Sequence, residues 1–209
     1  TLKPGSDKFS TRIVLDIKEG PLVKGFLTAD NYGNRYTGQN RATGIININN
    51  PTKIGDQATI NVINAPTGNF NLYKLGYNFP LGRNGMRANL SLNNLDYKIA
   101  KELKTDPMSK GNANTYAANV SYPLYRSAIR TLIISGGYNI KNMYNETTGV
   151  VTSDKKVNAY NSIISFQNID KIYLGGYMQT SISFSLGNLD LTGSQSDLSS
   201  DQSSTGSKT

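Results

Sequence analysis

The residues of this chain that could do chemistry are carboxylates, serines and lysines, because the sequence contains neither histidine nor cysteine. It therefore lacks the commonest general base, any thiolate nucleophile and any disulfide. Asp16 and Glu19 lie close together, but no base or nucleophile stands near them. A serine–lysine pairing is formally possible, yet nothing in the spacing places one. We expect that the chain is not an enzyme.

Cofactors, metals and nucleic acids are not expected as ligands either. Asp190, Asp197 and Asp201 are loosely spaced and match no calcium-loop pattern. The net charge is +8, from 22 basic and 14 acidic residues, but no dense basic run is interleaved with aromatic residues as a nucleic-acid surface requires. The basic residues are scattered, and mostly in segments that resemble turns: Lys53, Arg83, Lys98, Lys101, Lys104, Arg126, Arg130, Lys155 and Lys156.

The elements that would position any site are predicted to be β-strands. Apolar and polar residues alternate with a period of two over residues 71–79, 86–93 and 115–122, and over a long stretch at 171–186. These runs approach the roughly nine to eleven residues that a tilted strand needs to cross a bilayer. Only 37% of the residues are hydrophobic, as in a barrel whose lipid-facing side chains alternate with lumen-facing ones. One short helical turn is plausible at 97–103.

The connections between these strands alternate in length. Short turns are expected at 50–56, 80–85, 123–130 and 168–171, and the other set, which includes the two longest loops, at 31–38, 65–69, 98–114 and 142–156. Short periplasmic turns and longer outer loops are typical of outer-membrane barrels. Amphipathic aromatic rings are expected near the strand ends, at the membrane interface. These are Tyr73, Tyr77, Phe79, Tyr122 and Tyr138.

The two ends of the chain differ from the middle. Residues 11–19 alternate apolar and charged side chains before a break at Gly20-Pro21, as in the last strand of a small soluble domain followed by a hinge. The residues from 193 onward are rich in Ser, Asp, Gln and Gly. We therefore predict three regions: the end of a soluble domain and a hinge at 1–21, barrel strands at 22–192, and a flexible polar loop or tail at 193–209.

A set of short motifs resembles the two-partner secretion transporters, the haemolysin and haemagglutinin secretion/activation family. The segment 29–38 resembles the connection between the first two barrel strands of that family, and three further motifs resemble its first three periplasmic turns. Residues 185–191 with Asp201-Gln202 resemble the loop after its ninth strand. The motif positions are Asp30, Asn31, Gly33, Thr37, Gly38 and Arg41, then Gly55 and Asp56, then Pro80, Leu81 and Gly82, then Tyr122, Pro123 and Leu124.

The resemblance implies an all-β fold: a sixteen-stranded transmembrane antiparallel barrel preceded by two periplasmic POTRA domains. The chain would supply the last strand of the second POTRA domain and about the first nine barrel strands. Residues 23–26, Val-Lys-Gly-Phe, look like a Val-Arg-Gly-Tyr/Phe motif that this family carries in a later, pore-entering loop. They stand instead at the start of the first strand, so we give them no pore-loop role.

The resemblance also implies a function. Such a transporter lies in the outer membrane of a Gram-negative bacterium and exports, and can activate, a large partner exoprotein such as a haemolysin or an adhesin. Its expected partners are that exoprotein, outer-membrane lipid and the barrel assembly machinery.

The polar side of the predicted strands would line the pore. Two interpretations stay open for these residues: a wet interior that any such barrel has, or a selective role toward the polypeptide in transit. The predicted pore-lining residues are Lys74, Arg87, Asn89, Asn93, Asn119 and Asn139.

Two rival functions belong to other classes. A passive porin or structural barrel would have the same alternation without exporting a partner. A soluble β-sandwich binding module would also alternate, but its strands usually run to about five or six residues.

Overall fold

The computed structural model describes residues 2–4, 9–14, 20–99, 109–170 and 175–203. A small sheet pairs β1 (Leu2–Pro4) with β2 (Thr11–Ile13) in antiparallel fashion. A large sheet holds nine strands, each hydrogen-bonded to its neighbours in sequence order. They are β3 (Val23–Asp30), β4 (Arg41–Asn49), β5 (Gln57–Asn64), β6 (Phe70–Pro80), β7 (Arg87–Lys98), β8 (Ser109–Arg126), β9 (Arg130–Thr147), β10 (Val150–Asp170) and β11 (Gly176–Asp190).

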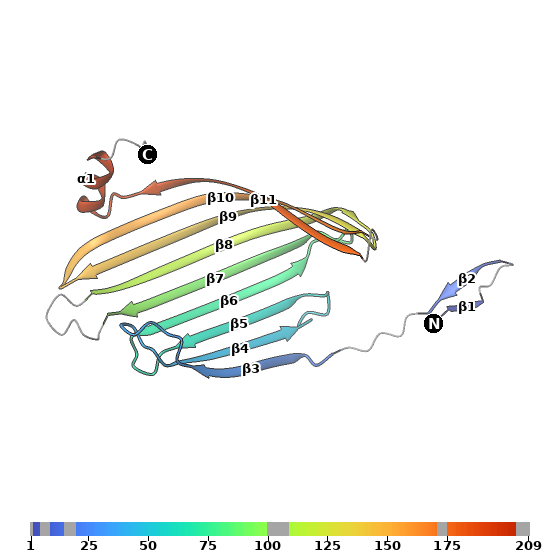
Figure 1. Cartoon of the computed structure of the whole chain (residues 1–209), viewed down its shortest axis with the longest axis horizontal. Coiled ribbons are helices and arrows are strands. Elements are labelled where there is room, and N and C mark those ends of the chain that lie inside the picture. The colour runs from blue at the N-terminus through green and yellow to red at the C-terminus, as the bar shows by residue number, and fades with distance from the viewer. Residues whose placement is uncertain (1, 5–8, 15–19, 100–108, 171–174, 204–209) are drawn as a thin grey trace.

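The large sheet is an antiparallel meander, and it confirms the predicted number of nine barrel strands (Figure 1). The predicted strands at 71–79, 86–93 and 115–122 fall within β6, β7 and β8. β11 takes up most of the predicted stretch at 171–186, whose first four residues lie outside the described ones. The sheet is open, with β3 and β11 at its edges. The Val-Lys-Gly-Phe segment starts β3, as expected.

The two longest expected connections are wrong, and two expected short turns are partly wrong because residues 123–126 belong to β8 and residues 168–170 to β10. The segment 142–156 is the end of β9 and the start of β10, joined by a two-residue turn with positive φ at Thr148 (53°) and Gly149 (79°). Positive φ at both central residues is the geometry of a tight hairpin turn, which leaves no room for a long loop. Residues 109–114 of the other expected loop belong to β8, and its residues 100–108 lie outside the described ones.

The helical turn expected at 97–103 is not formed by its first residues. Tyr97 and Lys98 continue β7, because both pair in register with β8. Residues 100–103 lie outside the described part of the chain. In that part no helix is long and apolar enough to cross a membrane.

The nine strands form one layer, so the apolar side chains have no second sheet to pack against. Among the described residues only three hydrophobic side chains are buried, Ala65, Ala88 and Leu191. Large ones in mid-strand stay open, with Leu90 at 48% and Phe184 at 60% exposure. A soluble β-sandwich would bury such residues between two sheets, and this arrangement excludes it.

The exposed apolar residues form a band of bilayer height. On β9 the band runs from Leu132 to Ile140 on one face of the strand. Nine residues at a rise of ~3.4 Å, tilted by ~40°, span about 23 Å, close to the roughly 25 Å apolar band of outer-membrane barrels. The sheet therefore has the structure of a transmembrane barrel wall.

The aromatic residues predicted near strand ends do not all lie there. Tyr77 and Phe79 stack with ring centroids 5.3 Å apart, close to the end of β6. Tyr138 lies instead in the middle of β9, where its ring contacts Tyr160 at 4.7 Å between centroids. The expectation that Tyr138 lies near a strand end is therefore wrong. The cause is the underestimated length of β9, which runs to Thr147.

The C-terminal segment differs from the expected flexible loop or tail at 193–209, since Gln195–Ser203 form the helix α1. Ser194 caps this helix, with its Oγ accepting a hydrogen bond from the Asp197 N–H at 3.4 Å. The Asp197 carboxylate pairs with the Lys155 ammonium of β10 at 3.1 Å. A cap and an ion pair thus hold a helix that has no apolar stripe, which explains why periodicity did not predict it.

The N-terminal strand begins as expected at Thr11, and residues 15–19 of that predicted strand lie outside the described ones. The assignment of 1–21 to the end of a POTRA domain and a hinge stays a prediction, as do the boundaries at 22–192 and 193–209.

The docking of α1 on β10 should be lost in acid. A hydrogen bond from Ser153 and the Lys155 charge hold the pKa of Asp197 below its ordinary value, against the opposing effect of burial. Because the pKa of this carboxyl is lower in the docked state, ionised Asp197 stabilises docking at pH values above the ordinary carboxyl pKa near 4. This stabilisation is lost as the pH falls through the lower pKa of the docked state. We expect a spin label at Ser199→Cys, in a chain without other cysteines, to become mobile as the pH falls below the ordinary carboxyl pKa of about 4.

The control for this measurement is Asp197→Asn in the same labelled chain. The label should then be mobile at neutral pH and insensitive to acid. A label that stays equally immobile in both chains would show that the ion pair does not hold the helix.

Candidate pore-lining face and its rim

The register of the sheet sorts every strand residue onto one of two faces. Lys74, Asn93, Thr115 and Lys141 pair in turn across β6, β7, β8 and β9, so they form one row on one face. Residues at even steps from this row share its face, because side chains of a strand alternate between faces. The apolar band, with Leu75 and Leu92 as one of its pairs, lies on the opposite face.

All six predicted pore-lining residues lie on the face of this row, the polar face. Asn89 pairs with Asn119 between β7 and β8, and Asn139 pairs with Ala117 between β8 and β9. Arg87 stands at the start of β7, where its Nε donates to Asn78 Oδ1 at 2.5 Å and its Nη2 to the Gly55 carbonyl at 3.0 Å. The sheet thus brings these residues together, while their role in lining a pore stays a proposal.

Many further residues of the polar face were not among the six named as pore-lining, although some lie on the polar side of the predicted strands. They lie between the predicted residues on β6 to β9 and continue the face over β4, β5, β10 and β11. Their amides and hydroxyls hydrogen-bond across strands, as between Thr59 and Asn47 at 2.9 Å and between Ser185 and Asn161 at 2.8 Å. The predicted alternation over 171–186 already places the last of them, in β11, opposite the apolar residues, but it did not name them as pore-lining. The added residues are Asn47, Gln57, Thr59, Asn61, Asn78, Ser91, Ser121, Ser135, Asn161, Ser165, Gln167, Gln179, Ser181, Ser183 and Ser185.

Charged residues are distributed unequally between the two faces. The polar face has a single acidic side chain among the described strand residues, Asp30, which is bonded to Arg41. The expectation that basic residues sit mostly in turns is wrong for five of them, which lie in β7 to β10, namely Lys98, Arg126, Arg130, Lys155 and Lys156. The basic strand residues on the polar face are Lys24, Arg41, Lys74, Arg87, Arg126, Lys141 and Lys155.

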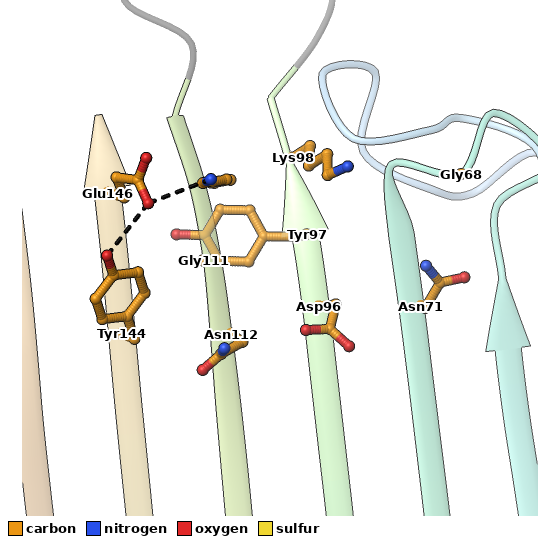
Figure 2. Close-up of a pocket in the computed structure, with 10 residues that line it drawn as sticks. Gly68, Asn71, Asp96, Tyr97, Lys98, Gly111, Asn112, Tyr144 and Glu146 are labelled. Atoms are coloured by element: carbon orange, nitrogen blue, oxygen red, sulfur yellow. Dashed lines mark hydrogen bonds and ion pairs between the residues drawn. The ribbon is translucent and has the colours of Figure 1, made fainter. Parts of the chain in front are cut away.

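The other acidic strand residues whose side chains are described lie on the opposite face, beyond the apolar band. Figure 2 shows part of this region, a cavity of about 460 Å³ lined by Asp96, Lys98, Tyr144 and Glu146 among others. Glu146 accepts a hydrogen bond from the Tyr144 hydroxyl at 3.2 Å and pairs with Lys110 at 3.2 Å. Acidic and basic groups therefore neutralise each other here. No group of three acidic residues among the described ones could hold a metal ion.

The first motif organises the loop between β3 and β4, which was predicted to be an outer loop. Asp30 Oδ1 accepts hydrogen bonds from Arg41 Nε at 3.0 Å and Nη2 at 2.9 Å, which joins the two strand ends. Within the loop the Gly33 N–H donates to the Gln39 carbonyl at 2.9 Å. Gly38 has a φ of 134°, and a Cβ there would lie 2.5 Å from Ala65 Cβ. This loop therefore packs against the next outer loop at residues 65–69.

The remaining positions of this first motif make fewer contacts. The Thr37 N–H donates to the Asn34 carbonyl at 3.2 Å, and Asn31 is exposed. Neither contributes a group to the polar face.

The second motif organises the turn between β4 and β5, which was predicted to be the first periplasmic turn. Asp56 is 3% exposed and accepts hydrogen bonds from the Tyr77 hydroxyl at 2.6 Å and from the Thr52 N–H at 3.2 Å. Burial of Asp56 opposes ionisation, but these bonds outweigh it and lower its pKa. Gly55 has a φ of 86° and its N–H donates to Asn50 Oδ1 at 2.7 Å. The turn is thereby fixed to β6.

The third and fourth motifs lie together at the same edge of the sheet. Pro80 ends β6, the Leu81 N–H donates to the Met86 carbonyl at 2.8 Å, and Gly82 has a φ of 76°. Pro123 and Leu124 mark a β-bulge, because the register with β9 shifts between Pro123 and Tyr125.

The two turns that carry these motifs touch, as a Cβ on Gly85 would lie 3.0 Å from Pro123 Cγ. Tyr122 lies on the apolar face at this edge, paired with Ile134.

The model of one protein family matches residues 10–206 of the chain: haemolysin secretion/activation protein ShlB/FhaC/HecB. The chain belongs to this family. The match covers nearly all of the described strands, and it confirms the resemblance that the motifs indicated.

Two relatives from one species are similar to the chain over most of its length. Heme/hemopexin transporter protein HuxB of Haemophilus influenzae is 23% identical over 155 residues in strain 86-028NP and 24% identical in strain Rd. The match covers 74% of this chain and 27% of either relative, so the chain spans about a quarter of the length of those proteins.

Two solved structures share the fold. CdiB from Escherichia coli superposes with a TM-score of 0.75 at 19% identity, over 90% of this chain and 35% of that one. CdiB from Acinetobacter baumannii gives a TM-score of 0.62 at 20% identity, over 80% of this chain and 31% of that one.

The face assignment predicts opposite effects for two neighbouring alanines of β8. Ala117 lies on the polar face and Ala118 on the apolar face. Ala118→Arg in the complete gene product should lower the free energy of unfolding in lipid vesicles by roughly 2–4 kcal/mol, since an arginine near mid-bilayer on the lipid face costs that much. Ala117→Arg should change it by less than about 1 kcal/mol. Urea unfolding measures both, and equal effects would contradict the assignment.

The packing of the two outer loops predicts that Gly38→Ala is destabilising. The added Cβ meets Ala65, which is fully buried, and the φ of 134° is unfavourable for alanine. We expect a loss of about 1–3 kcal/mol, measured as a lower urea midpoint. Gly20→Ala is the matched control, since nothing lies within 4 Å of a Cβ there. A Gly38→Ala midpoint equal to that of Gly20→Ala would contradict the packing.

Proposed function

We propose that this chain forms part of the wall of an outer-membrane pore that exports a partner exoprotein. The observation that carries the proposal is that the six predicted residues lie on one face of the sheet together with many other polar residues. An apolar band lies on the opposite face. Membership of the haemolysin secretion/activation family supports it.

The chemistry of the polar face suits a polypeptide in transit. Its amide and hydroxyl groups can exchange hydrogen bonds with an unfolded backbone at many similar positions. Passage through a pore requires contacts favourable enough to admit the chain and weak enough to release it. A face of Asn, Ser, Thr and Gln offers such contacts, as along β10 and β11.

The proposal includes the cellular location of the chain and its partners. The apolar band would face the lipid of the outer membrane of a Gram-negative bacterium, and the barrel assembly machinery would insert the barrel. The edge with turns at 50–56 and 81–86 would face the periplasm, where a POTRA domain ending within residues 1–21 would deliver the exoprotein. No catalytic step enters this account.

Two matched substitutions separate an export pore from a passive one. Ala117→Trp adds a bulky ring to the polar face and Ala118→Trp adds the same ring to the lipid face. We expect deletion of the complete gene to abolish release of one partner protein into the medium while other outer-membrane proteins stay unchanged. Restoring the gene with Ala118→Trp should restore release, and Ala117→Trp should restore less of it at equal barrel levels.

Quantitative blotting of medium and outer-membrane fractions gives both readouts. Unchanged partner release in the deletion strain would exclude export and leave the passive porin.

A further inference from the structure

We propose that the polar face selects acidic segments of the polypeptide that crosses the pore. This inference rests on the proposed export function and names the class of polypeptide that the pore favours. It depends on the distribution of charge over the sheet and on an acidic segment of the chain itself that contacts a basic residue of the polar face at the start of β10.

The charges of the sheet are segregated by face. Among the described strand residues the polar face carries seven basic side chains and one acidic one, which is bonded to one of the seven. Among the strand residues whose side chains are described, the opposite face carries four of each sign, Lys98, Lys110, Arg130 and Lys156 with Asp96, Glu146, Asp154 and Asp190. The positive charge of the sheet is thus a property of one face.

The basic groups of the polar face extend over the full height of the wall. Lys24 lies near the periplasmic edge, Lys74 and Lys141 share a row in the middle, and Lys155 lies toward the outer edge. Clefts lined by charge of one sign raise the local concentration of the opposite charge and exclude the same sign. Among the described residues no acidic side chain pairs with Lys24, Lys74 or Lys141.

The chain provides its own example of an acidic segment on this face. α1 has the sequence Gln-Ser-Asp-Leu-Ser-Ser-Asp-Gln-Ser, with two acidic residues and no basic one. Its Asp197 pairs with Lys155, which belongs to the polar face because it pairs in register with Met143, two residues from Lys141. The Ser196 hydroxyl donates to the Thr152 carbonyl at 3.2 Å. An ion pair and a hydrogen bond therefore help to hold a polar, acidic peptide at this end of β10.

Acidic polypeptide fits this face better than nucleic acid does. Single-stranded nucleic acids bind proteins through aromatic rings on which bases stack, in addition to basic groups. The aromatic strand residues lie mainly on the opposite face, as Tyr73, Tyr77, Tyr116 and Tyr138 do. The polar face offers amides and hydroxyls between its basic groups, which suit a peptide backbone.

The test measures block of the pore by three synthetic peptides. The complete gene product is placed in a planar bilayer, and peptides with the sequence of residues 195–203 are added on the periplasmic side. One has the natural aspartates, one has asparagine at both positions and one has lysine at both. We expect block in the order aspartate, asparagine, lysine, with block by the aspartate peptide falling as salt is raised.

Two matched double variants locate the effect. Lys74→Gln with Lys141→Gln, on the polar face, should weaken block by the aspartate peptide about fivefold, since two exposed charge contacts are removed. Lys98→Gln with Lys156→Gln removes the same charge from the opposite face and should leave it unchanged.

Equal block by the aspartate and lysine peptides, or equal loss in both double variants, would overturn the inference while leaving the export pore intact. A bilayer without conductance would contradict the proposed pore itself.

Discussion

Backbone hydrogen bonding between neighbouring strands is the constraint on which this structure depends. Lipid offers no partner to a backbone N–H or C=O, so each strand in a membrane must pair along its length. The ladder from β3 to β11 provides that pairing, and its register fixes the face of every side chain. The apolar band, the polar face and the separation of charges all follow from one alternation carried across nine strands.

The motif residues act on this ladder at its two edges. Asp30 and Arg41 join the ends of β3 and β4, and Asp56 holds the turn between β4 and β5 against Tyr77. The glycines of the outer loop allow contacts that a side chain would block. Contacts of this kind fix the ends of strands, which explains why short motifs predicted the topology and said little about the pore.

Sequence reasoning predicted best where one side of a strand is apolar. β6 and β7 alternate strictly through the band, and their faces and turn were predicted correctly. Prediction failed where the strands continue beyond the band, because both faces are polar there. The hairpin of β9 and β10 was taken for a loop for that reason, and its Thr148-Gly149 turn gives a weaker signal than Asn-Gly or Asp-Gly.

The same error concealed the charge of the polar face. Lys155 and Arg126 were assigned to turns, so their common face with Lys74 did not emerge until the register was known. The helix α1 was not predicted because it is held by a local cap and by an ion pair between segments distant in sequence. The periodicity of a single segment does not predict which residues pair across the sheet.

The assignment of the two faces is the central claim, and spin-label accessibility tests it most directly. Single cysteines at each position from 115 to 122 of β8 would be labelled in the complete gene product in lipid vesicles, and collisions with oxygen and with a water-soluble nickel complex compared. We predict maximal oxygen access at 116, 118, 120 and 122 and maximal nickel access at the positions between them, because the strand alternates between faces. Oxygen and nickel access without a period of two, or with the opposite phase, would contradict the account.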